Sequence, residues 1–245
     1  MNKDIRGIIL AAGRGSRMGH HTTNKPKCRT ILHGKELIEW QLEALNGAAI
    51  KNIAIIRGYL PDTFDFDVHY FDNKRWSKTN MVSSLISANE WLEKSICITS
   101  YSDIVYTKKS VEILINAPGD IVITYDPNWE KIWTERFDEP LSDAESFRID
   151  NDSKVLEIGA RVKDISQING QYMGLVKYTP KGWGMILDYL SDLDEVDIDN
   201  LDMTSLLSNL IKSGIVVNGV PINEPWFEVD TESDLILYSK LEKLF

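Results

Sequence analysis

Long apolar segments are absent from this sequence. Its longest uninterrupted apolar runs are only a few residues, whereas a membrane-spanning helix needs about 20. The first six residues lead directly into a strand-like segment and contain no apolar stretch of a secretory signal. We therefore expect no membrane association and a cytoplasmic location.

Cysteine and histidine are scarce. Cys28 and Cys97 are the two cysteines among 245 residues, and their separation matches neither a disulfide framework nor a metal-ligand spacing. The four histidines likewise show no zinc-ligand spacing: His20, His21, His33 and His69. The acidic stretch 188–202 lacks the residue order of a calcium loop, so we expect it to be a solvated connection.

Positive charge is also in deficit, with 27 Lys and Arg against 37 Asp and Glu and a formal net charge of −10. A protein that binds nucleic acid needs a basic face, so nucleic acid is not an expected partner. An anionic small molecule would have to be held by a local group of cations. Such a group occurs within fourteen residues: Arg14, Arg17, Lys25 and Lys27.

The first half of the chain alternates between strand-like and helix-like segments. The apolar pattern predicts strands at 5–11, 52–57, 68–71, 96–99 and 121–125, and helices at 35–45, 81–92 and 108–116. This alternation predicts a Rossmann-like α/β fold with a mixed, mostly parallel sheet flanked by helices. Ligands of such sheets collect at the carboxyl ends of the strands.

The pattern changes after residue 126. Short strand-like pieces at 145–149, 155–159 and 172–178 alternate with polar turns, which predicts a small antiparallel insertion at about 126–178. Helices are expected at 181–190, 204–212 and 233–244, and a strand at 215–220. We interpret residues 1–245 as a single domain.

The glycine-rich segment 13–19 fits neither of two common phosphate-binding motifs. A dinucleotide fingerprint would need glycine at Met18, and a P-loop would need a second glycine five residues after Gly13 or Gly15. What remains is a strand, then Ala-Ala-Gly-x-Gly-Ser-Arg-x-Gly, then Lys-Pro-Lys at 25–27. Small residues let backbone N–H groups approach a triphosphate. A solvated loop with incidental charge is the alternative, which the position after the first strand disfavours.

These residues resemble the signature of the nucleotidyltransferases that make NDP-sugars and CDP-alcohols. The resemblance implies the nucleotide-diphospho-sugar transferase type of fold, with Arg17 on the β- and γ-phosphates and Lys27 on the reacting α-phosphate. It also implies a loop that holds the triphosphate: Leu10, Ala11, Ala12, Gly13, Arg14, Gly15 and Ser16. Cys28-Arg29-Thr30 departs slightly from the small or apolar residues that usually follow, which leaves the base-side contacts of that turn open.

Two aspartates match the metal-binding positions of the same family. Asp103 follows an apolar strand, and Asp230 lies in a Glu-x-Asp-Thr segment before a helix. Mg²⁺ prefers carboxylate oxygens, and a triphosphate brings it as a cofactor. Taken singly, each aspartate could instead be a turn or capping residue. Ser102 is assigned to the nucleotide site, and Glu228 is a weaker candidate for the metal.

The segment Asn-Met-Val-Ser-Ser-Leu at 80–85 is similar to a motif of the phosphocholine and aminoalkylphosphonate cytidylyltransferases, and Gly58 lies in a turn that resembles the family's base site. The resemblance implies a cytosine site near Gly58, Asn80 and Ser84, and hence CTP as the nucleotide. On its own, Asn80 could simply be a helix N-cap.

The middle section supplies the candidate acceptor-binding residues: Trp129, Arg136, Glu157, Tyr172 and Lys177. Trp129 and Trp133 could stack on a cationic head group, or could equally pack the insertion at their i, i+4 spacing. Arg136 and Arg161 instead favour an acceptor with a carboxylate. Phosphoglutamine cytidylyltransferases of capsule synthesis, in the same branch, would fit that acceptor.

The expected function is Mg²⁺-dependent transfer of CMP from CTP to a small phosphorylated or phosphonate acceptor, with release of pyrophosphate, in capsule or surface polysaccharide biosynthesis. An NDP-sugar pyrophosphorylase that uses UTP or dTTP with a sugar 1-phosphate is an alternative. A catalytically silent, nucleotide-sensing subunit is another, which the joint presence of Arg17, Lys27, Asp103 and Asp230 disfavours. The acceptor and the oligomeric state, a homodimer included, are left open.

Overall fold

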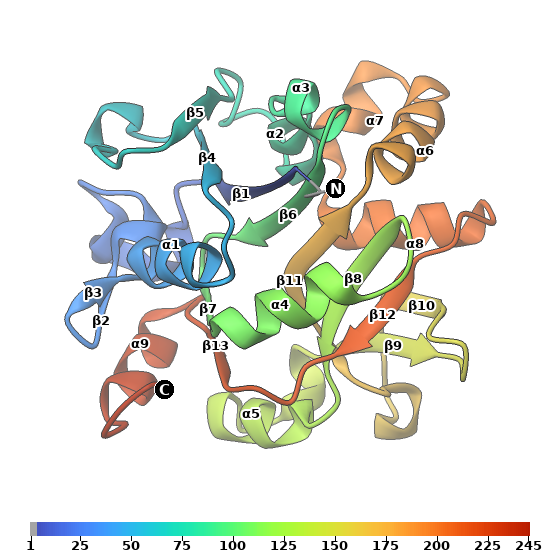
Figure 1. Cartoon of the computed structure of the whole chain (residues 1–245). Helices are drawn as coiled ribbons and strands as arrows, with labels where there is room; N and C mark the ends of the chain where they lie inside the picture. The colour runs from blue at the N-terminus through green and yellow to red at the C-terminus, as the bar shows by residue number, and fades with distance from the viewer. Residues whose placement is uncertain (1–3) are drawn as a thin grey trace.

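Continuous apolar runs form the centre of the molecule, because strands covered by helices on both faces bury side chains on each side. In the computed structural model, which describes residues 4–245, these runs make a seven-stranded sheet (Figure 1). Its order across the sheet is β12 (Asn218–Pro221), β8 (Ile121–Asp126), β11 (Gln171–Tyr178), β6 (Ile96–Tyr101), β1 (Ile5–Ala11), β4 (Asn52–Arg57) and β5 (His69–Asp72). All neighbours pair in parallel except β11, which is antiparallel to β6 and β8. The predicted mostly parallel sheet is confirmed.

Helices cover both faces of this sheet. Alternate side chains of a strand point to opposite faces, so Ile8 packs in one core and Ile9 in the other. The first core also takes residues of α2 (Met81–Ile86), α3 (Asn89–Leu92), α6 (Pro180–Ser191) and α8 (Met203–Lys212). The second takes residues of α1 (Leu37–Gly47), α4 (Lys108–Asn116) and α5 (Trp129–Arg136).

Smaller elements complete the chain. Three two-stranded sheets pair β2 (Ile31–Leu32) with β3 (Lys35–Glu36), β7 (Ile104–Tyr106) with β13 (Trp226–Glu228), and β9 (Glu145–Ile149) with β10 (Val155–Arg161). The remaining helices are α7 (Glu195–Asn200), α9 (Glu232–Ser239) and the 3-10 turns η1 (Ser16–Thr22), η2 (Lys27–Arg29), η3 (Pro61–Thr63), η4 (Pro140–Ser142) and η5 (Ile165–Gln167). No helix among the described residues is long and apolar enough to cross a bilayer.

The structure differs from the sequence prediction in several places, of which four follow. The strand expected at 172–178 belongs to the middle of the main sheet rather than to the insertion, and it is buried on both faces. The helix expected at 81–92 is broken at Ala88, whose ψ of 18° is not helical. The acidic connection contains α7, which Asp194 caps. The last helix ends at Ser239, before the predicted residue 244.

Candidate active site

The sheet topology brings the predicted loop and both predicted aspartates to one edge. β1 and β6 are parallel neighbours, with Leu10 opposite Tyr101, so the glycine-rich loop after β1 and Asp103 after β6 begin side by side. β13 then pairs with β7 so that Glu228 lies opposite Ile104. One further hydrogen bond joins Val229 N to the Asp103 carbonyl at 2.8 Å. Asp230, near the end of the chain, is thereby placed beside Asp103.

A cavity of about 250 Å³ opens at this edge. Its walls come from the loop after β1, the start of α2, the turn after β6 and the segment after β13: Leu10, Ala12, Gly13, Gly15, Arg17, Lys27, Met81, Ser84, Tyr101, Ser102, Asp103, Glu228 and Asp230. Most of the residues predicted for phosphate, metal and base binding are thus brought together in one hollow. Tyr101 is a wall residue that no motif singled out, and Met81 belongs to the 80–85 motif although no role was assigned to it.

Lys27 lies at the centre of the charges in this cavity. Its Nζ donates hydrogen bonds to Asp103 Oδ2 at 2.7 Å and to Asp230 Oδ1 at 2.6 Å. Arg17 forms an ion pair with the other oxygen of Asp230. Burial alone would lower the pKa of Lys27, but the two carboxylates raise it, and the net shift is upward. The ammonium is therefore held charged between the two aspartates.

The backbone of the loop fits closely around Lys27. Gly15 has φ of 71°, in the left-handed region that favours glycine. A Cβ at this position would lie 2.5 Å from the Lys27 Cβ. The loop can approach the lysine only because residue 15 has no side chain.

Carboxylates outnumber the cations that balance them at this edge. Glu228 faces Asp103 and Asp230, and burial together with these charges raises its pKa to about 7 although Arg136 lowers it. Arg136 pairs with Glu228 at 2.6 Å and with Asp234 at 2.8 Å. Asp103 Oδ1 is buried and has no hydrogen-bond partner among the described residues. A cation with a preference for oxygen ligands would satisfy that atom.

Two of the three predicted base-site residues lie at the cavity: Gly58 packs against the loop, and Ser84 is part of the wall. Gly58 is in close contact with Ala12, since a Cβ there would lie 2.6 Å from the Ala12 carbonyl oxygen. Ser84 lines the cavity, and its Oγ accepts a hydrogen bond from Asn73 at 3.0 Å. The side chain of Asn80 instead caps α2, by accepting from Met81 N at 2.8 Å.

The loop residues outside the cavity walls lie around it. Arg14 projects over the ring of Tyr59, with its Cζ 5.7 Å from the centroid. Ser16 begins η1, and Ala11 is buried at the end of β1.

The predicted acceptor residues scatter. Trp129 and Trp133 are buried, with ring centroids 6.0 Å apart, as expected if they pack the insertion and do not stack on a head group. The Arg136 side chain is only 2% exposed and is occupied by Glu228 and Asp234. Lys177 pairs in register with Ile98, near the opposite end of β6, and donates to the Ala117 carbonyl.

The other two acceptor candidates differ in their distance from the cavity wall. Tyr172 meets Tyr101, a wall residue, edge-on at 5.7 Å between ring centroids. Glu157 lies on β10 and faces Arg148 at 3.8 Å. Tyr172 and Arg136 are therefore the two candidates in direct contact with wall residues, Tyr101 and Glu228 respectively.

The structure places Glu228, the weaker metal candidate, in the cavity wall beside Asp230, and it adds Asp234, which sequence reasoning missed. Asp234 accepts from the backbone N–H groups of Asp230 and Thr231 at 3.0 and 2.9 Å and completes a capping box at the start of α9. The Thr-x-x-Asp spacing at 231–234 is the sequence signal that could have predicted this role.

Known proteins resemble this chain along most of its length. The MobA-like NTP transferase domain matches residues 7–145. A CTP:phosphoglutamine cytidylyltransferase from Campylobacter jejuni is 36% identical over 201 residues, which are 78% of this chain and 79% of that enzyme. A choline-phosphate cytidylyltransferase from Streptococcus pneumoniae is 37% identical over 99 residues, 38% of this chain and 43% of that enzyme.

A solved structure shares the fold. The inositol-1-phosphate CTP transferase from T. maritima aligns with a TM-score of 0.74 at 17% identity and covers 96% of this chain and 95% of its own. At that identity the likeness speaks for the fold alone, and it agrees with the nucleotidyltransferase fold that the glycine-rich motif implied. The family match, together with the 36% identical relative, identifies the chain as a member of the MobA-like NTP transferase family.

Proposed function

We propose that this chain transfers CMP from CTP to phosphoglutamine or a closely similar phosphorylated amino acid, with release of pyrophosphate. The observation that carries the proposal is the position of Lys27 between Asp103 and Asp230, with Arg17 beside them, in a cavity walled by the glycine-rich loop. The 36% identical relative is named for this reaction.

The reaction needs little covalent chemistry from the protein. An oxygen of the acceptor phosphate forms a bond to the α-phosphorus of CTP, and the bond from that phosphorus to the bridging oxygen breaks as pyrophosphate leaves. The attacking oxygen is already ionised near neutral pH, because the second pKa of a phosphate monoester is about 6. No general base is required, and catalysis rests on positioning and on charge neutralisation.

Each cation has a place in this scheme. Backbone N–H groups of residues 12–16 hold the triphosphate, as in an anion-binding nest. Lys27 neutralises charge at the α-phosphate, and Arg17 neutralises charge on the departing pyrophosphate. Both side chains already line the cavity, so the substrate meets them without a change of fold.

Mg²⁺ is the cofactor that the carboxylate group fits. Asp103 and Asp230 would hold it, with Glu228 as a third oxygen donor, and the unpartnered buried Oδ1 of Asp103 supports this assignment. When bound, Mg²⁺ supplies a Lewis-acid charge to the phosphate oxygens. Lys27 and Arg17 offset part of the charge of Asp103 and Asp230, and Arg136 offsets that of Glu228.

The burial of the two tryptophans bears on the choice of acceptor. Trp129 and Trp133 are buried in the core, so they are not available to stack on the quaternary ammonium of phosphocholine. This weakens the phosphocholine alternative. The preference for an amino-acid acceptor rests on the 36% identical relative, because Arg136 is itself occupied by Glu228 and Asp234. A cytoplasmic location, a role in capsule or surface polysaccharide biosynthesis and a homodimeric assembly remain predictions.

Pyrophosphate release tests the proposal. The chain is assayed with CTP, UTP, dTTP, ATP or GTP against phosphoglutamine, phosphocholine, 2-aminoethylphosphonate or glucose 1-phosphate, with MgCl₂. We expect the highest kcat/KM with CTP and phosphoglutamine. Turnover only with UTP or dTTP and glucose 1-phosphate would refute the assignment.

A charge-removing variant tests the site. Asp103→Asn keeps the shape of the side chain and removes its charge, and we expect a loss of at least about 100-fold in kcat, as for other groups that stabilise charge in the transition state. Asp120→Asn is the matched control, because Asp120 pairs with Lys181 outside the cavity. Near-normal activity of Asp103→Asn would contradict the metal assignment.

A further inference from the structure

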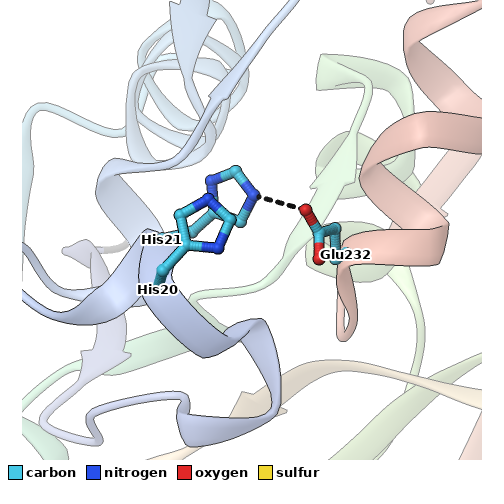
Figure 2. A group of neighbouring side chains, drawn as sticks. All are labelled: His20, His21 and Glu232. Carbon is cyan, nitrogen blue, oxygen red and sulfur yellow. Dashed lines mark hydrogen bonds and ion pairs between the residues drawn. The ribbon is translucent and has the colours of Figure 1, made fainter.

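A second group of metal-ligating side chains lies beside the candidate active site. It consists of His20 and His21 on η1 and Glu232 on the first turn of α9 (Figure 2). One ligand atom from each residue can be chosen so that the three lie within 4.8 Å of one another. None of these residues lines the cavity that holds Lys27.

The backbone directs the two imidazoles to the same place. η1 is kinked at Gly19, whose φ of 56° and ψ of −124° are not helical. The two histidines after the kink carry their rings side by side in a tilted arrangement, with centroids 4.1 Å apart and planes inclined by 33°. Figure 2 shows the two rings together and the carboxylate of Glu232 directed toward them from the neighbouring segment. His21 Nε2 lies 3.2 Å from Glu232 Oε1.

We propose that His20, His21 and Glu232 form a site for a divalent transition-metal ion of the Zn²⁺ class. Imidazole nitrogens and a carboxylate are ligands that Zn²⁺ accepts, and bonds of about 2.0–2.1 Å to a tetrahedral ion place neighbouring ligand atoms about 3.3 Å apart. The His21–Glu232 separation of 3.2 Å is close to this value, and side-chain rotations that bring the remaining ligand atoms from within 4.8 Å to about 3.3 Å of one another would complete the set. Three protein ligands leave one position open to water or an external ligand.

The His20–His21–Glu232 site lies between two segments that also contribute to the cavity. Two side-chain contacts join the same two segments: the ion pair of Arg17 with Asp230, and the contact of His21 with Glu232. A metal ion bound by His21 and Glu232 joins η1, which carries Arg17, to the segment that carries Asp230. The site therefore acts as a clamp between the phosphate-binding loop and the C-terminal part of the chain.

Zinc titration tests the proposal on the full chain without a histidine tag. Isothermal titration calorimetry with ZnCl₂, carried out in excess MgCl₂ to occupy the carboxylates of the cavity, is expected to give one high-affinity site per chain. Removing a direct ligand should weaken binding at least as much as removing an outer-shell partner, which costs about 10–100-fold. His20→Ala, His21→Ala and Glu232→Gln are each expected to show such a loss.

Two matched controls make the result decisive. His69→Ala removes an exposed histidine on β5, and Asp103→Asn alters the carboxylate group in the cavity; both are expected to keep the zinc affinity of the original chain. Replacement of Zn²⁺ by Co²⁺ should give visible absorption bands that His20→Ala and Glu232→Gln lose. No binding to the original chain, or binding that Asp103→Asn abolishes and His21→Ala leaves intact, would overturn the proposal.

Hydrogen–deuterium exchange tests the clamp itself. Zn²⁺ is expected to slow amide exchange in residues 16–23 and 231–235 of the original chain, and to leave both segments unchanged in Glu232→Gln. Binding without slower exchange in these segments would refute the clamp.

Discussion

Lys27 shows how one residue can serve both the fold and the reaction. A lysine is seldom buried without a partner, and this one is buried with two carboxylates at hydrogen-bond distance. The same contacts keep Asp103 and Asp230 close together, which their mutual repulsion would otherwise oppose. The residue that is assigned to the α-phosphate is therefore also the counter-ion of the proposed metal ligands.

Lys27→Met removes both contributions, to the reaction and to the fold. The change keeps the aliphatic stem and removes the charge, so we expect kcat/KM to fall by about 10²–10³-fold. The free energy of unfolding should also fall, by about 3–5 kcal/mol, because Asp103 loses its cationic partner and Asp230 keeps only Arg17. Urea unfolding and pyrophosphate release measure the two effects.

The double variant Lys27→Met with Asp230→Asn separates the effect on stability from the effect on activity. It removes one of the two opposing charges, so stability should recover in part while activity does not. Lys181→Met is the control, since its ion pair with Asp120 is exposed and contributes about 0–1 kcal/mol. Full activity of Lys27→Met would contradict the catalytic role.

Among the secondary-structure elements, those set by local pattern were predictable and those set by tertiary contacts were not. The predicted limits of β1, β4 and α4 agree with the structure residue for residue. The strand at 172–178 was recognised, but its place between β6 and β8 depends on long-range pairing that no local pattern encodes. Short α7 was missed because polar, acidic residues dominate it.

Arg136 links three elements at the active-site edge. It lies at the end of α5, and its guanidinium binds Glu228 at the end of β13 and Asp234 on α9. Arg136→Met should reduce the free energy of unfolding by about 3–5 kcal/mol, because both carboxylates lose a buried partner. Arg148→Met, which disturbs the exposed pair with Glu157, is the control and should change it by less than about 1 kcal/mol.

The loss of stability in Arg136→Met should depend on pH in a defined direction. The pKa of Glu228 is about 7 in the folded chain, above its ordinary value of 4.5. A group with a raised folded pKa contributes stability at low pH, which is lost as pH rises through the folded value. Without Arg136 that pKa rises further, so the variant should be more strongly destabilised at pH 8 than at pH 5 in EDTA buffer. An equal deficit at both pH values would mean that Glu228 does not titrate in this range.

At the scale of the whole molecule, the site is assembled from segments far apart in the chain. Lys27 and Asp230 are 203 residues apart, and His21 and Glu232 are 211 residues apart. The first pair could be predicted because each residue lies in a motif of its family. The second could not, because the histidines show no zinc spacing among themselves and their third partner arrives only through the fold.

Because both ends of the chain contribute to one cavity, binding of CTP should stabilise the entire domain. At a CTP concentration about 100 times Kd, linkage gives about 2.7 kcal/mol, or a rise of roughly 5–10 °C in Tm for a chain of this size. This rise should require Mg²⁺: with EDTA, the three carboxylates of the cavity meet the triphosphate without a neutralising ion, and most of the shift should disappear. Asp230→Asn should show a smaller shift with Mg²⁺ and little further change with EDTA, whereas Asp120→Asn should behave like the original chain. If the CTP-induced rise in Tm is the same in EDTA and in MgCl₂, CTP binds without Mg²⁺ and the assignment of Mg²⁺ to the nucleotide site is refuted, whatever the activity measurements give.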